Sequence, residues 1–290
     1  MIRDFERFAP KTLKEALTLL DKYQDDCKII AGGQSLLVLM RQGLVTPKYL
    51  IDIKGISELS YIKSDKDGLK IGALTTHRTI EKSPKMRGGF VVLAEMENRL
   101  ASIQTRNWGT IGGNICHADP AGDPAPVLIA LNATLKMASR KGERTMAMED
   151  FCLDYFETAL EPGELLTEIV IPAVPPHTGT AYTKFNVIES DLATVGVAVS
   201  ITLGSGDGVC KDVRIALGAA APTPMRAKKA EAVLKGKKIT DNLLVEAGEI
   251  ASTEAEPISD IYASEEYRRE LVKVLVKRMG KEALARAKQA

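Results

Sequence analysis

Two glycine-containing segments combine residue types and spacing that suggest ligand chemistry. They are Ala31-Gly32-Gly33-Gln34-Ser35-Leu36 and Thr110-Ile111-Gly112-Gly113-Asn114. Glycine lets a backbone come close to a ligand because it has no Cβ, and it permits positive φ. Successive amide groups in such a turn form a concave site for an anion. One Gly-Gly pair alone is usually only a turn, but two pairs flanked by small hydrogen-bonding residues favour a phosphate-bearing ligand.

The titratable residues near these segments offer little proton-transfer chemistry. Asp119 and Asp123 allow three readings: paired acid and base, turn and helix-cap residues, or, for Asp123, a hydrogen bond to ligand hydroxyls. Turn or cap is the preferred reading. The three histidines have no metal-ligand spacing; we interpret His77 as structural and His117 as the best candidate for a cofactor contact. A phosphate ligand without a general base suits a redox cofactor, which carries its own chemistry.

Neither glycine segment has the G-x-G-x-x-G or G-K-[ST] pattern, so a nicotinamide Rossmann site or a P-loop is not expected. The 290 residues are 45% hydrophobic, with 39 basic and 38 acidic side chains, which disfavours nucleic acid as a partner. Four scattered cysteines indicate free thiols and no metal in this chain. The charged N-terminus and the lack of a long apolar run predict a cytoplasmic protein without a membrane span.

Hydrophobic periodicity predicts the elements that would position the glycine segments. A helix over 13–20 precedes a strand over 27–31, which runs into the first glycine pair. A helix over 36–40 ends near Gly43, and a strand over 49–53 follows. This places the first pair at the carboxyl end of a strand, where open α/β sheets bind ligands.

The rest of the chain predicts two further regions. The first region begins with a hairpin that turns at Asp67-Gly68. It also has helices over 75–80, 90–100 and 124–131 and strands over 135–138 and 166–171. A loop over 106–114 is expected, with Trp108 packed beneath it. The second has strands over 182–185, 195–203 and 209–217 and helices over 227–235, 241–251 and 264–279. This second region reads as a small antiparallel sheet packed by helices.

The chain resembles the FAD-binding medium subunit of molybdenum hydroxylases, a family that includes the flavoprotein subunit of carbon monoxide dehydrogenase and the flavin domain of xanthine dehydrogenase. The matching segments are 31–36, 71–77, 106–114, Ala118-Asp119-Pro120 with Asp123, 161–166, 184–185, 191–193 and 267–269. The resemblance implies an α+β fold. Two α/β FAD-binding subdomains of the PCMH type, similar to vanillyl-alcohol oxidase, would span 1–55 and 56–176. A C-terminal domain over 177–290 would hold an antiparallel sheet with a helical bundle.

The resemblance also implies the site residues. The pyrophosphate and ribityl chain would lie against 31–35 and 110–114, Asp123 would hydrogen-bond the cofactor, Leu166 would contact it through its backbone, and Lys184 would lie near the flavin ring. The implied cofactor-binding set is Ala31, Gly32, Gly33, Gln34, Ser35, Leu36, Thr110, Ile111, Gly112, Gly113, Asn114, Asp123, Leu166 and Lys184. The FAD would be non-covalent, with no catalytic residue and no 4Fe–4S cluster in this chain.

The implied function is electron transfer within a complex. A small partner would carry two 2Fe–2S clusters, a large partner would hold the molybdenum cofactor and the substrate, and the assembly would be a heterotrimer or a dimer of heterotrimers. Related subunits often have arginine at the position of Ile188 and tyrosine at that of Leu192, so the covering of the flavin face differs here. Two alternatives stay open: a stand-alone FAD oxidase or reductase with its own substrate pocket, and a non-catalytic interaction module.

Overall fold

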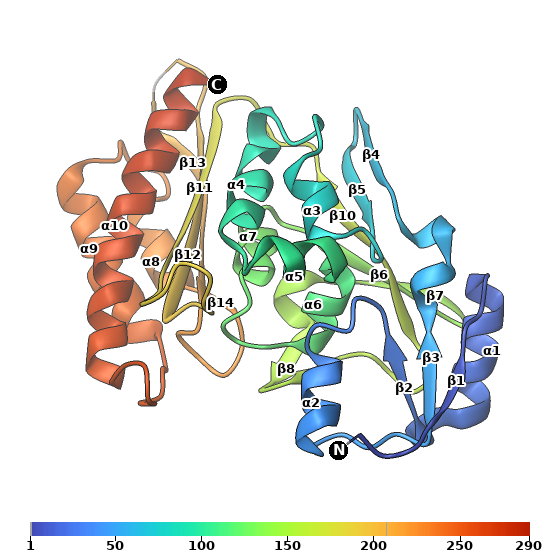
Figure 1. The fold of residues 1–290 in the computed structure, drawn as a ribbon. Helices are drawn as coiled ribbons and strands as arrows, with labels where there is room; N and C mark the ends of the chain where they lie inside the picture. The colour runs from blue at the N-terminus through green and yellow to red at the C-terminus, as the bar shows by residue number, and fades with distance from the viewer. Residues whose placement is uncertain (1, 207) are drawn as a thin grey trace.

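A computed structural model describes residues 2–206 and 208–290. The α+β fold class is confirmed: helices pack on several separate sheets, and an antiparallel sheet with helices ends the chain. In Figure 1 the N-terminal elements lie at the right, the middle of the chain at the centre and the C-terminal elements at the left. In the described residues no helix combines the length and the apolar character needed to cross a membrane.

The N-terminal part is a parallel sheet with one helix leading into its second strand and another leaving it. Its strands are β1 (Glu6–Phe8), β2 (Cys27–Ile30) and β3 (Tyr49–Asp52), in the order β1-β3-β2, and its helices are α1 (Leu13–Tyr23) and α2 (Leu36–Gln42). Thr12 caps α1 by accepting a hydrogen bond from the Glu15 amide. Gly43, at a φ of 74°, ends α2. The predicted helices and strands of this part are therefore confirmed.

The middle part contains a five-stranded antiparallel sheet in the order β4-β5-β10-β6-β7. Its strands are β4 (Ile62–Asp65), β5 (Gly68–Gly72), β6 (Thr134–Ser139), β7 (Gly142–Ala147) and β10 (Leu165–Pro172), and a small ribbon adds β8 (Cys152–Asp154) and β9 (Glu157–Thr158). The Asp67-Gly68 hairpin is confirmed. The strands β7, β8 and β9 were not predicted, because they are partly exposed and lack a regular apolar alternation.

Five helices cover this sheet: α3 (His77–Glu81), α4 (Val91–Arg99), α5 (Ile103–Trp108), α6 (Ile111–His117) and α7 (Pro124–Ala130). The predicted loop over 106–114 is wrong in detail, since it is the end of α5 and the start of α6, joined by Gly109 and Thr110. Thr110 is the N-cap of α6, and its side chain accepts a hydrogen bond from the Gly113 amide. A small polar residue at this position is typical of the start of a helix. Trp108 is not packed beneath a loop: it is 56% exposed, with the Lys54 ammonium 4.4 Å from its ring centroid.

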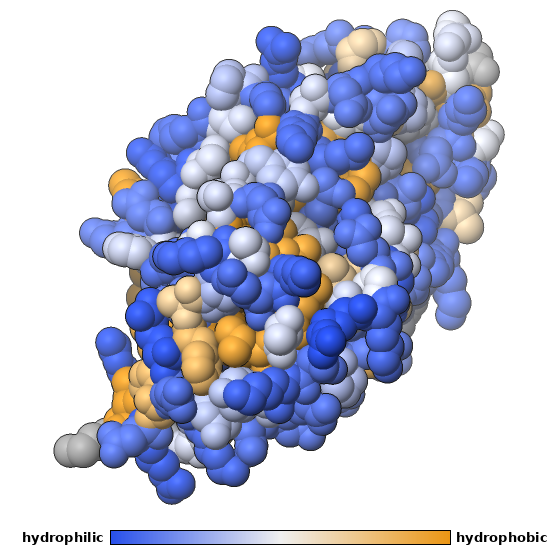
Figure 2. All heavy atoms as spheres, turned by 90° about the vertical axis from the view of Figure 1, so that its right-hand side faces the viewer, coloured by the Kyte–Doolittle hydropathy of each residue, from blue (hydrophilic) through white to orange (hydrophobic). Residues whose placement is uncertain are grey.

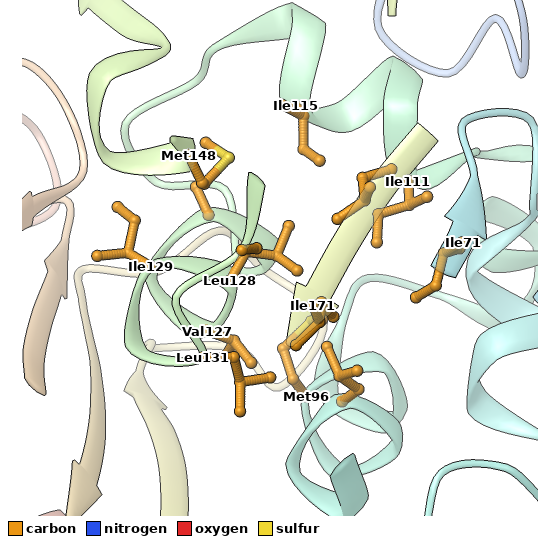
Figure 3. Close-up of a cluster of buried hydrophobic side chains, with 14 of the residues drawn as sticks. Ile71, Met96, Ile111, Ile115, Val127, Leu128, Ile129, Leu131, Met148 and Ile171 are labelled. Carbon is orange, nitrogen blue, oxygen red and sulfur yellow. The ribbon is translucent and has the colours of Figure 1, made fainter. Parts of the chain in front are cut away.

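The main core lies between the middle sheet and its helices. Side chains from β5, β10, α4, α6 and α7 point toward one another there (Figure 3). Ile71, Met96, Ile111 and Leu128 are fully buried at its centre. This packing fixes the first turn of α6 against the sheet and so holds the second glycine pair in place.

The C-terminal sheet is buried on both faces. Its strands are β11 (Thr178–Phe185), β12 (Val195–Leu203), β13 (Cys210–Gly218) and β14 (Met225–Arg226), and its helices are α8 (Lys228–Leu234), α9 (Asp241–Glu254) and α10 (Glu265–Gln289). Val197 and Val199 pack toward the helices, whereas Ala198 and Ala216 join the core of the middle part. The predicted antiparallel sheet is confirmed, and α10 continues ten residues beyond its predicted end at Met279.

Candidate functional site

A cavity of about 860 Å³ lies where the three parts of the chain meet. It is lined by every residue of the implied cofactor-binding set except Ile111, whose side chain is fully buried in the core. Leu36 lines the cavity as the first residue of α2. Leu166 lies in β10, and because its side chain packs in the core, its backbone is the part that faces the cavity. The surface on the N-terminal side of the molecule is mostly hydrophilic, with apolar side chains gathered toward its middle (Figure 2).

The first glycine segment supplies unpaired hydrogen-bond donors. Within the described residues, the backbone amides of 33–36 have no protein acceptor, although they line the cavity. Gly33 has a φ of 74° and Ser35 is right-handed helical, so the chain reverses direction there as in an anion-binding nest. The Gln34 side chain donates back to the Gly32 carbonyl at 3.2 Å and steadies the turn.

The second glycine segment differs, because the amides of 111–114 are already paired. The Ile111 amide donates to the Thr75 carbonyl and the Gly112 amide to the Ala73 carbonyl. The Gly113 and Asn114 amides both donate to Thr110, at 3.1 and 3.0 Å respectively. The second segment therefore contributes side chains to the cavity and a backbone that a ligand can approach closely, whereas the first segment contributes free amide hydrogen-bond donors.

The glycines also have different physical roles. A Cβ on Gly32 would lie 2.3 Å from the Trp108 carbonyl oxygen, and one on Gly112 would lie 2.6 Å from the Ala73 Cβ. Both positions thus require glycine because protein packs against them. A Cβ on Gly113 would press on the Thr110 hydroxyl, at 2.8 Å, and would otherwise make only an ordinary contact with the Ala31 Cβ at 3.8 Å. Among these three glycines, Gly113 is therefore the one at which the missing Cβ can serve the close approach of a ligand.

Asp123 joins the middle part to the C-terminal sheet. One carboxylate oxygen accepts from the Tyr182 hydroxyl at 2.5 Å and the other accepts from the Lys184 ammonium at 2.7 Å. Burial raises the pKa of Asp123, against the opposing effect of Lys184 and Tyr182. Asp123 does precede α7, but its side chain makes no cap hydrogen bond, so the preferred cap role is wrong for the side chain. Asp119 forms the expected turn by accepting from the Ala121 amide.

Two further polar groups line the cavity. His77, interpreted as structural from the sequence, pairs with Glu97 at 2.8 Å. Glu164, which was not predicted as a site residue, forms a bidentate pair with Arg144 at 2.6 Å. The sequence gives no signal for either ion pair, because the partners are 20 residues apart. Tyr182, the second partner of Asp123, lies two residues before Lys184 on β11 and so shares its face.

His117 lines the cavity as expected for the best histidine candidate. Its ring lies against that of Phe156, with the centroids 5.2 Å apart. Burial lowers the pKa of His117, so its imidazole is neutral near pH 7. The side chain therefore serves as a flat, uncharged wall of the cavity.

The fold and the cavity together are those of a protein that binds a nucleotide cofactor. Residues 3–174 match the family described as the FAD binding domain in molybdopterin dehydrogenase, and residues 180–283 match the CO dehydrogenase flavoprotein C-terminal domain. The chain is 36% identical over 282 residues to the carbon monoxide dehydrogenase medium chain of Hydrogenophaga pseudoflava, covering 97% of this chain and 98% of that one. It is 35% identical over 279 residues to the glyceraldehyde dehydrogenase medium chain of Sulfolobus acidocaldarius, covering 96% and 98%.

Solved structures agree with these relatives. A structure of carbon monoxide dehydrogenase from Hydrogenophaga pseudoflava superposes with a TM-score of 0.95 at 37% identity, covering 99% of both chains. Quinoline 2-oxidoreductase from Pseudomonas putida 86 superposes with a TM-score of 0.92 at 33% identity, covering 99% of both chains. The chain therefore belongs to the family of FAD-binding medium subunits of the molybdenum hydroxylases, and it is an oxidoreductase subunit.

Proposed function

We propose that this chain carries electrons between the 2Fe–2S clusters of a small partner subunit and an external acceptor. A large partner would hold the molybdenum cofactor and the substrate, in a cytoplasmic heterotrimer or a dimer of heterotrimers. The observation that carries the proposal is the single cavity lined by both glycine segments and by the Asp123–Lys184 pair. Bound FAD supplies the redox chemistry there, because a flavin exchanges electrons in pairs or singly.

The residues of the cavity suit a large, anionic cofactor. The free amides of 33–36 are placed to receive the diphosphate, and the wall at Gly113 lets the cofactor lie close to the backbone. Asp123 and Lys184 are both nearly inaccessible, so their charges are held at fixed positions. Burial raises the pKa of the Cys116 thiol to about 12, so it stays protonated and unreactive, in accord with non-covalent binding.

The same residues argue against a stand-alone oxidase. Such an enzyme needs a free general base beside the flavin. Asp123 is engaged by Lys184 and Tyr182, and Glu164 is engaged by Arg144. The third carboxylate at the cavity is that of Asp191, and it is not engaged in this way, because Lys184 bonds to the backbone carbonyl of this residue. Two of the three carboxylates at the cavity are thus committed to ion pairs. This arrangement favours a chain that holds and orients a cofactor over one that removes a substrate proton.

Cofactor analysis of the purified full-length chain tests the proposal. We expect one FAD per chain after reconstitution, released by acid or heat, with no iron and no molybdenum. Reduction of the flavin by a substrate is expected only after the iron–sulfur and molybdenum subunits are added. Flavin bleaching by a substrate in the isolated chain would establish the stand-alone enzyme instead. A folded chain that takes up no FAD would support the interaction module.

A further inference from the structure

His77 and Glu97 form a buried pair at the wall of the cavity. The side chain of His77 is 2% exposed and that of Glu97 is fully buried, with 2.8 Å between Nδ1 and one carboxyl oxygen. The other carboxyl oxygen of Glu97 has no hydrogen-bond partner among the described residues. His77 is therefore the one group that balances this carboxyl, and burial raises the pKa of Glu97.

The cations near this pair are bound to other partners. Glu97 is within electrostatic range of Asp123 and Arg106. Asp123 is paired with Lys184 at 2.7 Å, and Arg106 donates to Glu81 at 2.9 Å and to the Leu100 and Ala101 carbonyls. Glu81 is shared with Arg78 and Lys82, but among the described residues His77 is the one side chain that hydrogen-bonds the Glu97 carboxyl. A buried net charge is expensive, so the dyad holds one proton more than a carboxylate beside a neutral imidazole would.

The extra proton determines whether Nε2 of His77 is a hydrogen-bond donor or an acceptor toward the cavity. The proton either stays on Glu97, which then donates to Nδ1, or it moves to Nδ1 as an imidazolium. The other ring nitrogen, Nε2, carries a hydrogen in both arrangements. The dyad is neutral overall in both, and only the position of one proton between Nδ1 and the Glu97 oxygen differs.

The ring is held so that this donor lies at the cavity. The His77 amide donates to the Gly109 carbonyl, and a Cβ on Gly109 would lie 3.1 Å from the His77 Cδ2. Cδ2 is bonded to Nε2, so this edge of the ring lies beside the junction of α5 and α6. Among the described residues Nε2 has no hydrogen-bond partner, and His77 lines the cavity.

We propose that His77 is a cofactor-contacting residue that donates a hydrogen bond from Nε2 to an oxygen of the bound FAD, and that Glu97 is the positioning residue that keeps the proton on Nε2. The inference rests on the proposed function, because it takes FAD as the ligand. It assigns a role to a histidine that the sequence presents only as structural.

FAD titration of the flavin-free full-length chain, followed by quenching of flavin fluorescence, tests the donor. His77→Phe removes it, and Glu97→Met removes the group that fixes the tautomer. Each is expected to raise the Kd about tenfold to a hundredfold. Glu97→Gln is the matched control, since its amide donates to Nδ1 and leaves the hydrogen on Nε2; we expect its Kd within about threefold of the wild type. A wild-type Kd for folded His77→Phe, or a Glu97→Gln loss equal to that of Glu97→Met, overturns the proposal.

Nitrogen-15 NMR of the flavin-free chain provides a readout that does not depend on FAD or on the stability of a variant. The proposal requires the His77 Nε2 to give the signature of a protonated nitrogen. A lone pair on Nε2, with the proton on Nδ1, overturns the inference. Absence of FAD binding by the wild type would overturn the proposed function and with it the assigned ligand, whereas the tautomer would still be decided.

Discussion

Asp123→Asn tests whether the Asp123–Lys184 pair holds the middle part to the C-terminal sheet. The substitution keeps the shape of the side chain but leaves the Lys184 ammonium, 2% exposed, without a negative partner: only neutral acceptors stay, the new amide oxygen and the Asp191 carbonyl at 2.9 Å. Removing one partner of a buried ion pair costs about 3–5 kcal/mol of folding free energy.

Urea unfolding of the flavin-free chain, followed by circular dichroism, measures these differences. Asp119→Asn is the matched control, because Asp119 accepts only from the Ala121 amide and pairs with no basic side chain. The double variant Asp123→Asn with Lys184→Met removes both charges and is expected to recover about 2 kcal/mol or more of the loss. A deficit below about 1 kcal/mol, or a double variant no more stable than the single one, would refute the reasoning.

Three other substitutions have distinct expected outcomes. Gly113→Ala should keep stability within about 1 kcal/mol yet weaken FAD binding tenfold or more, whereas Gly112→Ala should lower stability by about 1–3 kcal/mol because its Cβ meets Ala73; unchanged FAD affinity in Gly113→Ala would contradict the close approach. The Arg144 hydrogen bond lowers the pKa of Glu164, so the pair stabilises above the unfolded pKa of glutamate and this stabilisation is lost as pH falls through the folded pKa. Arg144→Met should cost about 1–2 kcal/mol at pH 7 and less near pH 3 in urea unfolding; equal deficits at both pH values would contradict it.

Local signals in the sequence predicted most of the helices and strands. Thr12 and Ser264 cap α1 and α10 because their hydroxyls need only a backbone amide three residues ahead. Local signals could not predict the pairing of Asp123 with Lys184, because 61 residues separate the partners. The helical start at Thr110 was misjudged because short helices rich in glycine are held by packing and caps more than by propensity.

The two glycine segments were read as equivalent, and the structure separates them. Residues 33–36 keep their amides free, whereas the amides of 111–114 are used by Thr110 and by carbonyls of the middle part. The residue types of the two segments could not distinguish free amides from paired ones, because the carbonyls that accept from Ile111 and Gly112 belong to Thr75 and Ala73, on a segment that is distant in the sequence. For Ile111 and Gly112 the division of roles follows from tertiary contact, whereas for Gly113 and Asn114 it follows from the local cap at Thr110.

This division has a consequence for how the cavity is built. Gly32 packs on the Trp108 carbonyl, so the N-terminal and middle parts fix each other, and Asp123 fixes the middle part to β11 through Tyr182 and Lys184. Every wall of the cavity thus depends on a contact between segments far apart in the sequence. A cofactor that touches all three parts binds only the assembled chain, so its binding free energy adds to the stability of the fold. Substitutions at these contacts are therefore expected to lower FAD affinity and folding stability together. His77→Phe is expected to do the same, because it leaves the buried Glu97 carboxyl without its hydrogen-bond partner, whereas Gly113→Ala is expected to lower affinity with little change in stability.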